Sequence, residues 1–157
     1  MPQMKTLIAF SLLALSTATN QLAYAHGSGS EYGDVGDARK VTRTIKIDMS
    51  EYAFNPTGLK FKAGETVKFI LTNRGKLMHE MTIGSPTEQL EHRKAMLDMS
   101  DMKHGEGEHA MPSNAVHVAP GGTKELIWLF AKAASLQIAC NYPGHADLGM
   151  ENNVVVE

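Results

Sequence analysis

The sequence of 157 residues contains a single cysteine, Cys140. One cysteine cannot form a disulfide within the chain, so a disulfide framework is excluded as a source of stability. The sequence also has no excess of positive charge, because 15 lysines and arginines face 17 aspartates and glutamates. Nucleic-acid-binding proteins normally show a clustered basic excess. We therefore expect no nucleic-acid partner, and the lone cysteine needs another explanation.

Long hydrophobic runs are also missing. The longest apolar stretch, from Leu7 to Leu15, is well short of the roughly 20 residues that a membrane-spanning helix needs. It follows Lys5 and precedes the small-residue sequence that ends at Ala25, which is the pattern of a signal peptide. We predict that residues 1–25 are a signal peptide, that the mature chain begins at His26, and that it is periplasmic with no membrane span.

The mature chain divides into two parts by composition. Residues 26–40 are rich in glycine, serine and charge, which predicts a flexible N-terminal arm. From residue 41 apolar and polar side chains alternate, which is typical of β-strands. Short strands separated by turns are predicted near residues 44–48, 59–61, 66–72, 81–83, 115–118, 124–130, 136–140 and 153–156, and residues 52–54 precede an Asn-Pro turn.

One segment interrupts this pattern. Ser85 or Thr87 is suited to cap a helix, and residues 88–102 have helix-forming composition without glycine or proline. We predict a helical insertion at about residues 85–115 within one domain of residues 41–157. Because strands do not alternate with helices elsewhere, the predicted fold is an all-β, Greek-key β-sandwich of seven to eight strands with one short helical insertion.

The chemistry is concentrated in the loop 140–150. Cys140, His145 and Met150 follow one another at five-residue steps across a Pro-Gly turn. A thiolate, an imidazole and a thioether together suit copper. A trigonal copper site with a weak axial thioether needs a second histidine. His79, directly before a predicted strand, is the better candidate, whereas His117 is expected to face solvent or pack against the insertion.

These motifs resemble the cupredoxin, or blue-copper, family. The resemblance covers residues 41–157 and is carried by residues 54–56, residues 63–67, Asn73 before His79, and the azurin-like spacing of the loop 140–150. It implies one copper ion cycling between Cu(I) and Cu(II), bound by His79, Cys140, His145 and Met150. Glu80 departs from the family pattern, because many blue-copper proteins have asparagine there to hold the cysteine loop. A site that is green or otherwise perturbed, and not intensely blue, is therefore expected.

The predicted insertion contains further soft donors. His92, Met96 and Met99 share one helical face, and Met102, His104, His109 and Met111 follow. They are candidates for a second, weaker Cu(I) site. The alternative is that Met96 and Met99, with Leu90 and Leu97, pack the helix onto the sandwich. His26 could chelate Cu(II) at a new N-terminus.

Three classes of function fit these motifs to different degrees. The insertion and Glu80 favour a role in copper homeostasis or tolerance, since residues 79–81 also resemble small periplasmic cupredoxins associated with that role. The alternative is a one-electron carrier between respiratory or other redox partners. An enzyme is disfavoured, because multicopper oxidases and nitrite reductases need further histidine clusters on further domains. We expect a monomer that contacts a redox or copper-handling protein transiently.

Overall fold

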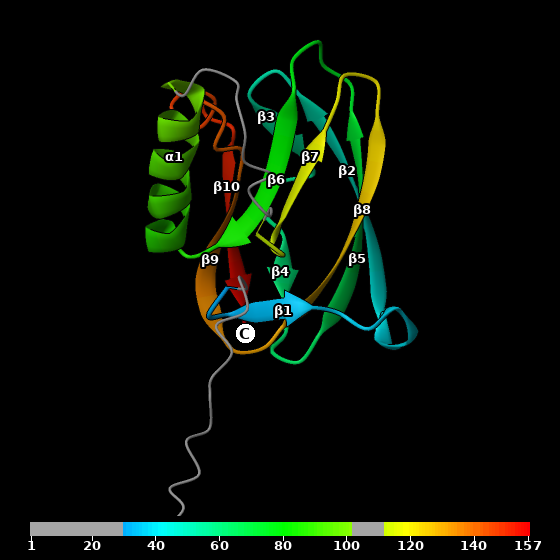
Figure 1. The fold of residues 1–157 in the computed structure, drawn as a ribbon. Coiled ribbons are helices and arrows are strands. Elements are labelled where there is room, and N and C mark those ends of the chain that lie inside the picture. Colours follow the sequence, from blue (N-terminus) through cyan, green and yellow to red (C-terminus); the bar gives the residue numbers. More distant parts are fainter. Residues whose placement is uncertain (1–29, 102–111) are drawn as a thin grey trace, which may run out of the picture.

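The computed structural model describes residues 30–101 and 112–157, with the side chains of residues 99–101 left aside. The predicted signal peptide (1–25), His26, the side chain of Met99, and the donors Met102, His104, His109 and Met111 lie outside the described residues. Ten strands form two five-stranded sheets that pack face to face (Figure 1). The predicted β-sandwich with one helix is confirmed, with more strands than the seven to eight expected.

The first sheet follows the predicted alternation closely. Its strands, in spatial order, are β1 (Gly33–Val35), β8 (Thr123–Phe130), β5 (Thr66–Asn73), β2 (Arg43–Ser50) and β3 (Ala53–Asn55). In β2 the side chains of Ile47 and Met49 are buried, while those of the alternating residues Lys46 and Asp48 are exposed. This period of two places one face of the sheet on the core.

The second sheet carries the strands that frame the loop 140–150. Its order is β4 (Lys60–Phe61), β10 (Glu151–Val156), β9 (Ala134–Ala139), β6 (His79–Gly84) and β7 (Ala115–Val118). β6 and β10 both run antiparallel to β9. The start of β6, the end of β9 and the start of β10 therefore meet at one end of the sandwich. Between the sheets lies an apolar core that includes Phe61, Phe69, Trp128, Phe130 and Ile138.

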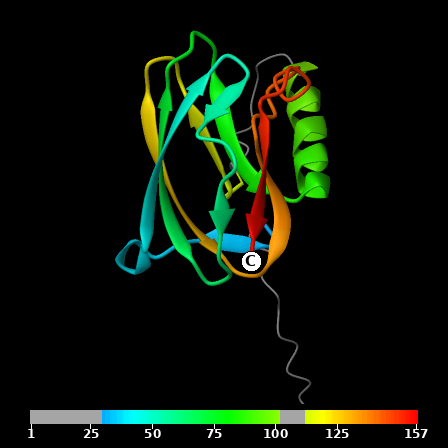
Figure 2. The same ribbon diagram turned by 180° about the vertical axis from the view of Figure 1, so that it is seen from behind.

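The predicted insertion contains one helix, α1 (Pro86–Asp101). Its N-terminus is a capping box: the Ser85 hydroxyl accepts from the Glu88 amide at 3.2 Å, and the Glu88 carboxylate accepts from the Ser85 amide at 2.6 Å. Ser85 is thus the cap. The helix lies along β6 and β9 (Figures 1 and 2). Its C-terminal end lies beside the loop that joins β9 to β10.

The expectation of a flexible arm is wrong for residues 33–40. Gly33–Val35 form β1, which pairs antiparallel with β8, and Ala38–Lys40 form a short 3-10 helix. Gly33 lies flat against Trp128, where a Cβ atom would come within 2.4 Å of the indole nitrogen. Period-two alternation cannot reveal such a strand, because its contact with the core depends on a missing side chain rather than on an apolar one.

In the described ranges no helix has the length and apolar character needed to cross a membrane. The C-terminus lies at the end of the sandwich opposite the loop 140–150 (Figure 2). The candidate ligands that the structure describes in the loop 140–150 therefore lie at the end of the sandwich away from the C-terminus.

Candidate metal centre

Three elements bring the candidate donors together. His79 is the first residue of β6, and Cys140 directly follows β9. These strands are hydrogen-bonded neighbours, with Thr82 opposite Ala139, so the two side chains reach the same end of the second sheet. Met150 directly precedes β10, whose first residue, Glu151, also lies opposite Ala139. The register of the strands thus brings His79, Cys140 and Met150 together from distant parts of the sequence.

The loop between Cys140 and Met150 folds back onto itself. The Cys140 amide donates to the Met150 carbonyl at 3.0 Å, and the Met150 amide donates to the His145 carbonyl at 3.0 Å. Gly144 and Gly149 have φ angles of 79° and 100°, in the left-handed region that glycine adopts without steric cost. These turns direct His145 back toward Cys140. The Met150 side chain is fully buried in the same cluster as Cys140.

One ligand atom each from His79, Cys140 and His145 lie within 4.8 Å of one another. The Cys140 Sγ to His145 Nδ1 distance is 3.3 Å, and the two imidazole rings have their centroids 5.2 Å apart. This is the only group of three or more such donors in residues 30–101 and 112–157. The structure therefore brings the three predicted donors together, and the backbone bonds hold Met150 beside them.

His79 carries the clearest sign of a missing ligand. Its side chain is completely buried, yet neither ring nitrogen has a hydrogen-bond partner. Leaving a buried polar group unpaired costs about 1–3 kcal/mol. A metal ion bonded to one nitrogen would supply the missing partner, which is why an orphaned imidazole beside a thiol fits a metal site.

The protonation of the donors also suits metal binding. Burial lowers the pKa values of His79 and His145, so both imidazoles are neutral and can donate a lone pair at pH 7. Burial raises the pKa of the Cys140 thiol to about 11, against the opposing effect of backbone hydrogen bonds from Glu80 and Tyr142. Without metal the cysteine is therefore a thiol, and a metal must displace its proton to bind the thiolate.

This donor set discriminates between metals. Two imidazoles and a thiolate with a weak thioether are typical of copper electron-transfer sites, whereas structural zinc sites take four strong ligands. The residues present therefore fit copper. A copper ion bound here would supply one-electron chemistry, because such a set accommodates both Cu(I) and Cu(II).

The rim of the site is apolar and partly open. His145 is half-buried, and the ring of Tyr52 meets it edge-on with centroids 5.3 Å apart. Tyr52 has a φ angle of 64°, which is uncommon for a residue other than glycine. Leu77 and Met78 directly precede His79 in the sequence, and Leu148 lies between His145 and Met150. All three side chains are exposed. His145 is thus the donor nearest to solvent, while His79 and Cys140 are fully buried.

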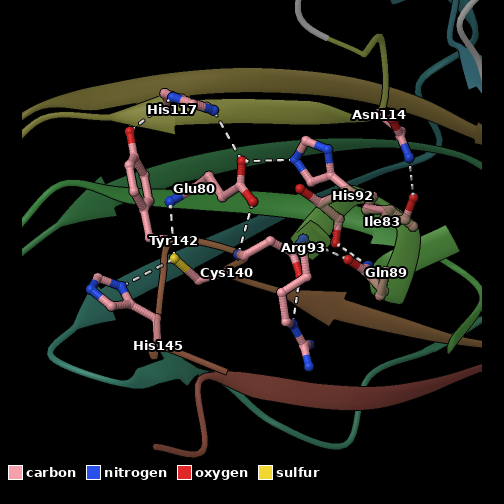
Figure 3. Close-up of polar contacts among 12 residues, drawn as sticks. Glu80, Ile83, Gln89, His92, Arg93, Asn114, His117, Cys140, Tyr142 and His145 are labelled. Atoms are coloured by element: carbon pink, nitrogen blue, oxygen red, sulfur yellow. Dashed lines mark hydrogen bonds and ion pairs between the residues drawn. The ribbon is translucent and has the colours of Figure 1, made fainter. Parts of the chain in front are cut away.

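The opposite side of the site contains a network that the sequence did not predict. The Glu80 side chain is completely buried, and its Oε2 lies 3.2 Å from His92 Nε2 and 3.0 Å from His117 Nε2 (Figure 3). Burial opposes ionisation of Glu80, but hydrogen bonds from His117 and His92 outweigh it and lower its pKa to about 2. Glu80 is therefore a buried carboxylate anion.

The two network histidines lie on either side of Glu80 and not among the metal donors. His117 lies opposite Glu80 in the β6–β7 ladder, is partly exposed, and shares the Glu80 carboxylate with His92, so it lies beside the predicted insertion, which was one of its two expected positions. Its Nδ1 is 3.0 Å from the Tyr142 hydroxyl. His92 contacts the Glu80 carboxylate. Met96 is buried, as the packing alternative predicts, whereas Leu90 and Leu97 are about half exposed.

Glu80 also holds the cysteine loop, which is the role that asparagine has at this position in many blue-copper proteins. Its Oε1 accepts a hydrogen bond from the backbone amide of Asn141 at 2.8 Å. Its own amide lies 3.4 Å from Cys140 Sγ and donates to it. The unusual residue after His79 was the one signal in the sequence that pointed to this network.

Known proteins with similar sequences and folds have names that refer to copper. Residues 41–157 match the sequence profile of the family described as copper binding proteins, plastocyanin/azurin family. The copper-resistant cuproprotein CopI of Rubrivivax gelatinosus is 38% identical over 135 residues, covering 85% of this chain and 78% of that protein. CopI of Pseudomonas aeruginosa is 35% identical, covering 98% of both chains. Auracyanin A, a blue copper protein of Chloroflexus aurantiacus, superposes with a TM-score of 0.58 and 26% identity, covering 73% of this chain and 98% of its own.

Proposed function

Because the chain belongs to the plastocyanin/azurin family of copper-binding proteins, we propose that it is a periplasmic cupredoxin acting in copper tolerance. In this proposal it binds one type 1 copper through His79, Cys140 and His145, with Met150 as the weak axial ligand. Residues 1–25 direct its export and are then removed. The ion is redox-active, and the protein is not an enzyme.

The observation that carries the proposal is the state of His79. Both of its ring nitrogens are buried without a partner, beside a thiol and a second imidazole within 4.8 Å. The role in tolerance is supported by the two CopI relatives, which are named copper-resistant and align with most or all of this chain. In a tolerance role the protein would bind periplasmic copper, and a copper-handling protein would be its transient partner.

A second function has its own support. The half-buried His145 and the exposed Leu148 form an edge on which a redox partner could dock for one-electron transfer. The similarity to auracyanin A fits this alternative, because that protein is described as a blue copper protein. A carrier would use the same copper and the same ligands, so only a cellular experiment separates the two roles.

The binding part of the proposal is tested by a copper titration of the purified mature protein. We expect one copper per chain after desalting, with a strong thiolate-to-copper absorption band. If the wild type binds a second copper and the Met96→Leu/Met99→Leu variant does not, the insertion contains the weaker Cu(I) site as well. Absence of a thiolate band in the wild type would contradict the assignment of Cys140.

The cellular role is tested by complementing a deletion strain. Wild type and the Cys140→Ala variant are compared for growth at rising copper concentrations, with secretion to the periplasm checked by fractionation. We expect Cys140→Ala to lose copper tolerance. If tolerance is unchanged but electron flow to an oxidase falls, the carrier function replaces the proposed one. The Met49→Leu variant, at a core methionine that is not a candidate donor, is a control for the general effect of replacing a buried sulfur residue.

A further inference from the structure

Helix α1 turns a polar face toward the sandwich. Gln89, His92, Arg93 and Met96 lie at spacings of three and four residues, so they share one face of the helix. Gln89 is 1% exposed and Met96 is 6% exposed, whereas Leu90 and Leu97 elsewhere on the helix are about half exposed. A surface helix normally buries apolar side chains. The burial of polar ones here indicates that they have specific partners.

Those partners surround Asn141, the residue directly after Cys140. The Asn141 side-chain amide donates to Gln89 Oε1 at 2.8 Å, and its Oδ1 lies 3.4 Å from Arg93 Nε. Its backbone amide donates to Glu80 Oε1. Asn141 is completely buried, so none of these bonds is exchanged freely for water. A single loop residue is thus held at three atoms, two of them by α1.

The remaining contacts tie the helix to the rest of the frame. Gln89 Nε2 donates to the carbonyls of Thr82 in β6 and Gln137 in β9, at 2.9 and 3.1 Å. Arg93 also reaches Glu151, the residue directly after Met150, at 3.3 Å. Arg93 therefore joins the residues that follow two of the proposed copper ligands.

Glu80 connects the helix to the sulfur atom. Its Oε2 faces His92 of α1, its Oε1 holds the Asn141 amide, and its own amide contacts Cys140 Sγ (Figure 3). A partly satisfied buried polar network costs more than an apolar contact would. Loss of one member of this network therefore leaves the others unpaired, and the cheapest relief is movement of the loop that carries Cys140.

We propose that helix α1 is a positioning element of the copper centre: Gln89, His92 and Arg93 hold Asn141 and Glu80, and thereby fix Cys140 before metal binds. The proposal rests on the proposed copper-binding function for its effect on the metal. Its effect on the loop does not need metal, because every contact that carries it exists in the metal-free chain. The insertion is then part of the redox centre and not an appendage.

The test uses Gln89→Leu, which keeps the side-chain size but removes all three of the hydrogen bonds described for Gln89. The control is Glu91→Leu, which places the same side chain on an exposed position of the same helix. Hydrogen exchange of the Asn141 backbone amide is measured by NMR in the copper-free protein. We expect at least tenfold faster exchange in Gln89→Leu and no change in Glu91→Leu.

The copper-loaded proteins give the second readout. In Gln89→Leu we expect the thiolate-to-copper band to shift and the Cu(I):Cu(II) ratio in a fixed-potential mediator buffer to change by at least tenfold, while Glu91→Leu matches the wild type. Unchanged exchange and an unchanged spectrum, with only a lower melting temperature, would show that α1 merely packs on the sandwich and would overturn the proposal.

Two further controls keep the result decisive. If Gln89→Leu fails to fold, Arg93→Met removes only the bonds to Asn141 and Glu151 and is subjected to the same two measurements and the same criteria. If the wild type forms no thiolate–copper band, the proposed function fails, but the exchange measurement still decides whether α1 holds the loop.

Discussion

The two sides of Cys140 satisfy their polar atoms in opposite ways. On the sulfur side, His79 has two buried nitrogens without partners, and the thiol has a raised pKa. On the backbone side, Asn141 and Glu80 are equally buried, but their polar atoms are bonded to a helix and two strands. The structure thus leaves His79 unpaired, while it bonds the polar atoms on the backbone side of Cys140. The sulfur side therefore suits a metal ion, whereas the backbone side is held in place by hydrogen bonds.

Removing the sulfur breaks the donor side completely. Cys140→Ala is expected to abolish the thiolate-to-copper absorption band, because no thiolate remains to donate charge. Visible absorption after copper addition and desalting checks this, with Met96→Leu as a buried-sulfur control that should keep the band. Survival of the band would mean that the ligands have been wrongly assigned.

Neutralising Glu80 weakens the backbone side. The folded pKa of Glu80 is about 2 against an ordinary 4.5, so its ionised form stabilises the fold above about pH 4.5, and this contribution is lost as pH falls toward 2. The shift corresponds to about 3 kcal/mol. We expect Glu80→Gln to remove that much of the pH dependence of the unfolding free energy in copper-free protein.

Urea unfolding between pH 2.5 and 6 measures this effect. The exposed Glu91→Gln variant serves as the control and should follow the wild-type curve. Parallel curves for Glu80→Gln and wild type would show that Glu80 is not held as an ion in the folded chain.

The number of protons released when copper binds is a further test of the donor side. Because the pKa of Cys140 is raised to about 11 and those of His79 and His145 are lowered, copper should displace one proton, from the thiol alone. Between pH 7 and 9 the apparent affinity should rise about tenfold per pH unit. Calorimetry in buffers of different ionisation enthalpy gives the proton count, and a count of zero or two would contradict this account.

The smallest effect is expected at the weakest proposed ligand. Met150→Leu should retain copper and raise the reduction potential, because the axial thioether donor is lost. We expect a shift of about 59 mV or less, which is a tenfold change in the Cu(I):Cu(II) ratio. Voltammetry of the loaded variant checks this, and an unchanged potential would mean that Met150 is not axial.

The sequence predicted the donor side better than the backbone side. Cys140, His145 and Met150 lie in one loop, where spacing and a turn suffice to suggest convergence, and His79 was found from its place before a strand. The contact of Glu80 with Asn141 spans 61 positions and depends on the pairing of β6 with β9. The contact with His92 depends on how α1 docks, which periodicity does not specify.

At position 52 the backbone conformation favours glycine, whereas the protection of the site favours the tyrosine ring. The φ angle of 64° at Tyr52 suits glycine, and a tyrosine there costs about 1 kcal/mol or more. Its ring nevertheless covers an edge of His145. A Tyr52→Gly variant would relax the chain and uncover the imidazole at once. Relief of the backbone strain at this position would therefore also remove the packing of the ring against the core and the shielding of His145 from water.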